Sequence, residues 1–177
     1  MHALIRNIRE ELVLRICTES ISRISKCINS LSDDQLTYNA NFNTNAVNNL
    51  ILHLDGNVRQ WLIASLMDKA YARNRSEEFD RSNVKSRKEL CNILEALDED
   101  VKIACERLSV SYLLATHSIQ GFTETGYSIC SHVVEHFSYH TGQITLITKQ
   151  ICDKDMNYYK GLDLNIKTNY NKLKSTC

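Results

Sequence analysis

The chain has 177 residues, a length that suits one domain with one sizeable hydrophobic core. Lys and Arg total 21, and Asp and Glu also total 21, so the formal charge is zero. This balance gives no electrostatic reason to expect nucleic acid or an anionic membrane as a partner. The sequence has no proline and only five glycines, which disfavours the many turns of a sandwich or barrel and favours a few long helices.

The cysteines and the N-terminus bear on the compartment. Seven cysteines occur at wide spacings, without a Cys-x-x-Cys pair, so neither a disulfide framework nor a zinc ribbon is predicted. We interpret most of them as small apolar core residues in a reducing compartment. Charge interrupts the N-terminus too early for a signal peptide, and no apolar stretch is long enough to span a bilayer. We therefore expect a soluble, cytoplasmic protein.

Two amphipathic helices are predicted in the first half of the chain. Over residues 3–31, apolar side chains recur every three to five positions, the stripe that an amphipathic helix shows. An asparagine-rich connection follows over residues 39–45, as is typical of a loop and the start of a helix. The apolar periodicity then returns over residues 46–69 and predicts the second long helix.

The whole chain, residues 1–177, is predicted to form one all-α, four-helix-bundle domain. Residues 71–83 are charged and non-periodic, which predicts a loop, with Ser82 or Asn83 as the candidate N-cap of a third helix. That third helix is predicted over residues 84–108, where apolar residues again recur at helical spacing.

The remaining segments are one ambiguous connection, the last helix and a tail. Residues 109–126 combine side chains of β character with Gly121, and either a short hairpin or an extended connection fits them. The fourth helix is predicted over residues 127–152, with Thr125 as its N-cap. The polar tail from about residue 153 is expected to wrap the bundle or to be partly irregular.

Three of the six histidines, His132, His136 and His140, lie on the predicted fourth helix. Side chains four apart share a helix face, so 132/136 or 136/140 could grip one metal ion. The outermost pair is about 12 Å apart along the axis, too far for one ion. Taken alone, such a pair favours a structural role, with each ring hydrogen-bonded inside a helix interface. His136 belongs to both metal-binding alternatives.

His53 changes this balance, because it lies among aliphatic residues on the predicted second helix, in the sequence LILHL at residues 50–54. A polar ring in such surroundings needs a partner if it is buried. A metal ion shared with the fourth helix would supply one, since bundle cores commonly build metal sites from side chains on facing helices.

Three segments resemble the DinB/YfiT-like superfamily. Residues 135–144 (EHFSYHTGQI) resemble its last-helix signature, and residues 52–61 (LHLDGNVRQW) resemble its second-helix signature. Residues 73–79 (RNRSEEF) resemble a loop pattern of one uncharacterised branch. The resemblance covers about residues 44–165, and the first helix fits by position only.

This resemblance implies a four-helix bundle with three metal-binding histidines, usually occupied by nickel or zinc. Carried over residue by residue, the ligands fall on His53, His136 and His140, and His132 becomes a neighbour. Many members have a further histidine where this chain has Tyr139, so any role of that ring is absent or altered here. Superfamily bundles often pair through helix faces, which implies a homodimer.

Side chains near the histidines are candidates to orient the imidazoles or to bind substrate. Asn49 and Asn57 lie one turn either side of His53, and Gln143 lies three residues after His140, with His132 as a further candidate. Helix–helix hydrogen bonding is the competing interpretation of the amides. No Ser-His-Asp arrangement or phosphate-binding glycine loop is apparent, and the sequence identifies no catalytic residue.

Three neutral nitrogens would leave coordination positions open, as in catalytic rather than structural zinc sites. An open ion lowers the pKa of bound water to about 7 or holds a thiol as thiolate. The expected function is a metal-dependent enzyme on a small molecule, of thiol S-transferase or hydrolase type, because characterised relatives include thiol-dependent S-transferases and a mycothiol-dependent isomerase. The alternative is a non-catalytic metal-binding stress-response or sensor protein, and a bundle with merely satisfied core histidines is a third interpretation.

Overall fold

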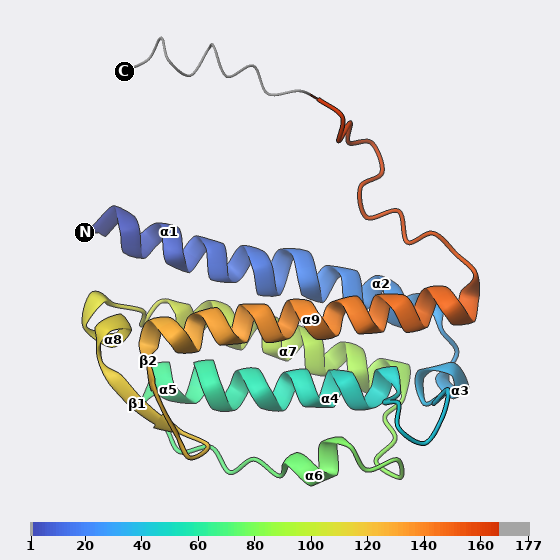
Figure 1. Ribbon diagram of the computed structural model, residues 1–177, viewed down its shortest axis with the longest axis horizontal. Helices are drawn as coiled ribbons and strands as arrows, with labels where there is room; N and C mark the ends of the chain where they lie inside the picture. Colours follow the sequence, from blue (N-terminus) through green and yellow to red (C-terminus); the bar gives the residue numbers. More distant parts are fainter. Residues whose placement is uncertain (1, 167–177) are drawn as a thin grey trace.

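The apolar stripes of four long helical stretches face one core in the computed structural model, which describes residues 2–166 (Figure 1). Each of the first two stretches continues through a wider π-helical segment without leaving helical backbone angles. The first stretch is α1 (His2–Val13), η1 (Leu14–Ile21) and α2 (Ser22–Ser30), and the second is α4 (Val47–Val58), η2 (Arg59–Ile63) and α5 (Ala64–Met67). Both confirm the predicted helices within two residues.

The third and fourth stretches are α7 (Arg87–Cys105) and α9 (Gly126–Cys152). Thr125 caps α9, as predicted, and its hydroxyl accepts a hydrogen bond from the Ser128 amide at 3.1 Å. The prediction that Ser82 or Asn83 caps the third helix is wrong, because Ser86 is the N-cap. Of the three positions, only Ser86 has a glutamate three residues later, and the Glu89 carboxylate accepts a hydrogen bond from the Ser86 amide at 2.8 Å.

The ambiguous connection forms both a short helix and a hairpin. Thr116–Ile119 (β1) pairs antiparallel with Phe122–Thr125 (β2), so the hairpin alternative is confirmed. Neither alternative included a helix, but residues Val110–Leu114, whose side chains are mostly of β character, form α8. The Ser109 hydroxyl accepts from the Tyr112 amide at 3.1 Å and caps α8, so a local cap overrides strand propensity.

Two connections are more ordered than a plain loop. The segment between α2 and α4 contains α3 (Asp33–Leu36), and the predicted loop at residues 71–83 contains the single-turn helix α6 (Arg75–Glu78). In Figure 1, α6 lies alongside α4, and its contacts with α4 confirm this placement. The segment that carries α6 therefore lies against the helix that carries His53.

The tail leaves α9 at Asp153, whose φ is 45°. It first packs on the bundle, where Met156 is buried and the Tyr158 ring lies under Arg23 and Lys26 of α2. Residues 159–166 extend further, and the rest of the predicted tail lies outside the described residues. Among the helices of residues 2–166, none is both long and apolar enough to span a bilayer.

Replacing Ser86 by alanine is expected to lower the free energy of unfolding by about 1 kcal/mol, because the Glu89 amide loses its cap acceptor. Urea denaturation measures this loss. Ser82→Ala, at a position that the sequence also suggested as a cap, serves as the control and should cost well under that. A larger loss for Ser82→Ala than for Ser86→Ala would contradict the observed start of α7.

Candidate metal centre

Three imidazole rings converge where α4 packs against α9. His53 comes from α4, and His136 and His140 lie one turn apart on α9. His136 Nε2 is 3.0 Å from His53 Nε2 and 3.2 Å from His140 Nε2, and one ligand atom of each ring lies within 4.8 Å of the others. Metal–nitrogen bonds of about 2.0–2.1 Å at a tetrahedral ion place its ligand atoms about 3.3 Å apart. The distances from His136 to His53 and from His136 to His140 match that geometry.

The sequence around each histidine dictates why the rings face inward. α4 is buried over most of its surface, and His53 is 5 % exposed between Leu50 and Leu54 of the core. On α9, Phe137 and Ile144 are buried in the core and fix the rotation of the helix. His136 and His140, four residues apart, share the neighbouring face and stay partly exposed.

The Nδ1 atom of His53 lies 2.8 Å from the carboxylate oxygen Oε2 of Glu78. Because an ionised carboxylate only accepts, His53 Nδ1 carries the proton and its Nε2 presents a lone pair to the centre. Arg73 Nη2 is 3.1 Å from the same Nδ1, but it also lies 2.7 Å from Oε2. Both groups therefore donate to one oxygen, and their closeness is not a bond between them.

Glu78 is held as a carboxylate although it is only 7 % exposed. Burial by itself would raise the pKa of Glu78, but hydrogen bonds from Arg73 and His53 outweigh burial and bring it below its ordinary value. Arg73 Nε also donates to Oε1 at 2.5 Å, so both carboxylate oxygens are engaged by the guanidinium. The buried charge of Glu78 is thus fully paired.

His140 is oriented in the same way by an amide. Gln143 Oε1 lies 2.7 Å from His140 Nδ1 and accepts a hydrogen bond from its N–H. The lone pair of His140 Nε2 then points toward the centre. Gln143 Nε2 in turn donates to the Tyr139 hydroxyl at 3.1 Å. Burial lowers the pKa of His140 despite the hydrogen bond to Gln143, and this favours the neutral ring that binds metal.

His136 provides the test of whether these residues fit a cation. The Nε2 atom of His136 faces the Nε2 lone pairs of both His53 and His140. If His136 carries its proton on Nε2, that single N–H can donate well to only one of the two. Its Nδ1 is buried and has no hydrogen-bond partner among the described residues. Burial, together with the neighbouring His140 and His53, lowers the pKa of His136 to about 3. The His136 ring is therefore not protonated at neutral pH, and a second N–H does not satisfy the close approach of the three Nε2 atoms. A cation placed among the three rings would relieve this contact, and three imidazole nitrogens could hold a divalent transition-metal ion.

Comparisons with known proteins place the chain in a family. Residues 10–162 match the family described as "Protein of unknown function (DUF1572)". The chain belongs to the DUF1572 family. A solved structure of a DinB-like protein from Bacillus cereus ATCC 10987 aligns with a TM-score of 0.60 over 78 % of this chain and 90 % of that one, at 15 % identity. This DUF1572 protein therefore has a DinB-like fold, as the resemblance implied, whereas a search of curated proteins gave no match.

Glu78 is the site residue that sequence reasoning missed in this DUF1572 protein. The charged, non-periodic segment around it predicted only a loop, whereas the structure fastens this segment to α4. Asn49 Nδ2 donates to the backbone carbonyls of Glu78 and Asp80, at 3.0 and 3.3 Å. Gly56 leaves room for the carboxylate, because a Cβ there would overlap Glu78 Oε1 and come 3.0 Å from Arg73 Nε. Two signals in the sequence could have pointed to it: Gly56 on the second helix, and the resemblance of residues 73–79, which include Arg73 and Glu78, to a family loop pattern.

The four candidate neighbours of the histidines differ in what they contact. Gln143 accepts a hydrogen bond from His140. Among the described residues, Asn49 makes no hydrogen bond to a histidine ring but donates to the backbone carbonyl of Glu78, which in turn contacts His53. His132 stacks on Trp61 with ring centroids 4.3 Å apart, while its centroid is 5.5 Å from that of His136. Asn57 makes no bond to a histidine within the described part of the chain, and its Oδ1 is buried without a partner there.

A DUF1572 protein with this centre should retain about one divalent ion per chain, and His53→Ala or His140→Ala should abolish retention because two imidazoles bind too weakly. Elemental analysis of protein purified without a histidine tag measures the ratio. His132→Ala is the matched control and should keep the ion, since its ring lies outside the cluster. Loss of the ion in His132→Ala but not in His140→Ala would instead support the 132/136 pair.

Glu78→Gln is expected to weaken metal binding about 10- to 100-fold, because the neutral amide no longer holds His53 Nδ1–H as firmly. Competition with a coloured chelator measures the dissociation constant. Glu77→Gln removes the neighbouring exposed carboxylate and should leave that constant unchanged. Equal affinities for the two variants would show that Glu78 does not orient the ligand.

Proposed function

We propose that this protein is a metal-dependent enzyme that acts on a small molecule at the three-histidine centre, by thiol transfer or hydrolysis, with nickel or zinc as its ion. The observation that carries the proposal is the convergence of three imidazole rings, two of which are oriented through their Nδ1 atoms by Glu78 and Gln143. Three nitrogen ligands leave coordination open, which is typical of catalytic rather than structural sites.

The centre lies at a cavity of about 500 Å³, which gives a small molecule access to it. An ion there supplies Lewis acidity, which lowers the pKa of a bound water or thiol toward neutrality. Phe79 lies against the His53 ring at 4.8 Å and shields that side from water. The Arg75 guanidinium lies over the Phe79 ring at 4.8 Å and lines the same cavity. Arg75 is thereby placed to bind an anionic group of a substrate.

Tyr139 and Gln143 form the opposite side of this cavity. Gln143 donates to the Tyr139 hydroxyl, so the hydroxyl hydrogen is free to donate to a substrate oxygen. The proposed division of work is that Arg75 and Tyr139 position the substrate, while Gln143 and Glu78 keep two ligand rings in register. A low-molecular-weight thiol is the proposed substrate of the transferase type.

A second candidate function, a non-catalytic metal sensor or stress-response binder, is favoured by one observation. Within residues 2–166, no aspartate or glutamate lines the cavity at the histidines, so no carboxylate is free to act as a general base. Glu78 does not fill that role, because both of its oxygens are occupied.

The two functions are separated by assaying metal-free, zinc-loaded and nickel-loaded protein with a panel of thiols, electrophilic acceptors and esters. The expected result is turnover that requires metal and falls at least about 100-fold in His53→Ala, since loss of a ligand removes the ion. His117→Ala, in the hairpin, is the control and should keep full turnover.

A protein that binds stoichiometric metal yet turns over nothing in a broad panel would contradict the enzyme. If metal then changed its oligomeric state, measured by sedimentation, the sensor would be supported instead.

A further inference from the structure

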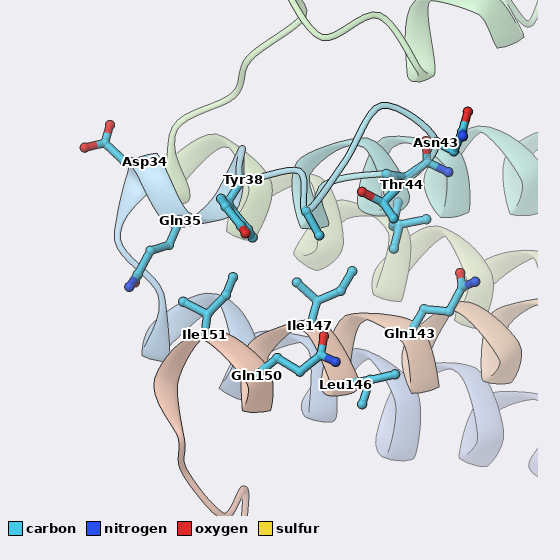
Figure 2. A pocket seen from close by; sticks show the side chains of 13 residues that line it. Asp34, Gln35, Tyr38, Asn43, Thr44, Gln143, Leu146, Ile147, Gln150 and Ile151 are labelled. Atoms are coloured by element: carbon cyan, nitrogen blue, oxygen red, sulfur yellow. The ribbon is translucent and has the colours of Figure 1, made fainter.

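A second and larger cavity adjoins the one at the histidines. It has a volume of about 970 Å³ and lies between α9 and the segment of residues 34–45 that precedes α4 (Figure 2). Asn45 and Gln143 line both cavities, so the two are neighbours at this point. Gln143 is also the residue that orients His140, so one end of the larger cavity, here called the α9 groove, lies near the candidate metal centre.

The walls of the α9 groove are mainly apolar. α9 contributes Leu146, Ile147 and Ile151, and Leu50 and Tyr38 line it from the other side. In Figure 2, Ile147 and Ile151 point from α9 into the gap toward Tyr38. Leu146 is 58 % exposed, so the groove displays apolar surface to water that a ligand could cover.

The charges around the two cavities differ in sign and position. Asp34 is the one charged side chain that lines the α9 groove within the described residues, and no lysine or arginine does. At the histidines, by contrast, Arg75 contributes a positive charge, and a divalent ion would add two more. A ligand that spans both cavities is therefore favoured if its head is anionic and its tail is uncharged.

The dimensions suit an elongated small molecule. From His140 to Ile151, α9 rises over about 16 Å, which sets the length of tail that the groove could cover. The volume of the groove lies at the upper end of the roughly 300–1,000 Å³ typical of small-molecule sites. A concave groove of this kind fits an alkyl or similar chain better than it fits a flat protein surface.

We infer that the α9 groove binds the elongated, uncharged apolar tail of the substrate, whose anionic, metal-ligating head lies among His53, His136, His140 and Arg75. This inference rests on the proposed metal-dependent function and names its substrate class as an amphipathic molecule with a single long tail. Gln143 stands where head and tail meet, and Leu146 and Ile147 contact the tail.

Straight-chain hydroxamic acids test this, because their anionic head binds zinc and the tail can be lengthened one methylene at a time. Isothermal titration of zinc-loaded protein is expected to show affinity rising about fourfold per methylene, until the tail fills the groove. An affinity that does not change with chain length, in protein that binds the shortest member, would overturn the inference and leave the proposed metal centre intact.

Leu146→Glu places a charge on the groove wall at an exposed position, so the protein should still fold. It is expected to remove most of the chain-length dependence while the shortest hydroxamate binds as before. Leu4→Glu on α1 is the matched control, because Leu4 is 59 % exposed but does not line the groove. An equal loss in both variants would contradict the assignment of the tail to this groove.

Metal-free protein titrated with straight-chain alcohols measures the groove without the centre. Binding that strengthens with chain length and is lost in Leu146→Glu supports the groove, even if metal analysis shows that the histidines hold no ion and the proposed function fails. If Leu146→Glu instead converts a dimer into a monomer and no chain-length dependence exists, a second copy of the protein covers the groove and the inference is wrong.

Discussion

Imidazole rings from two helices present their Nε2 lone pairs to a common point most firmly where the opposite nitrogen of the ring is held as a donor. In this protein Glu78 holds His53 and Gln143 holds His140, at 2.8 and 2.7 Å. His136 then faces two lone pairs with a single nitrogen, an arrangement that a cation stabilises and that neutral rings alone satisfy only in part. The candidate metal centre and the proposed chemistry at it depend on this arrangement.

The supporting interactions explain why a charged loop lies against an apolar helix. Glu78 and the side chain of Arg73 are 7 % and 3 % exposed, and breaking such a buried pair typically costs about 3–5 kcal/mol. Asn49 fastens the backbone of the same loop, and Gly56 leaves the space that the carboxylate fills. Structural and functional requirements thus coincide: the contacts that anchor the loop also fix the tautomer of one candidate ligand.

Much of this could be predicted from sequence, because the relevant signals are local. The apolar stripes of the four long helices, the four-residue spacing of His136 and His140, and Gln143 one turn from His140 depend only on helix geometry. Glu78 could not be predicted in this way, since its burial depends on Arg73 and on clearance at Gly56, both set by long-range packing. The helix α8 was missed because the Ser109 cap outweighed the β propensity of its residues, and the α9 groove is defined only when two distant segments meet.

The central claim is that His53, His136 and His140 share one cation through their Nε2 atoms. Anomalous diffraction from crystals of the zinc-loaded protein, collected on both sides of the zinc absorption edge, tests it most directly. The account predicts one strong anomalous peak about 2.0–2.2 Å from all three Nε2 atoms, with a further position open to the cavity. A peak elsewhere, ligation through Nδ1 of His53, or no peak at the rings after zinc loading would contradict it.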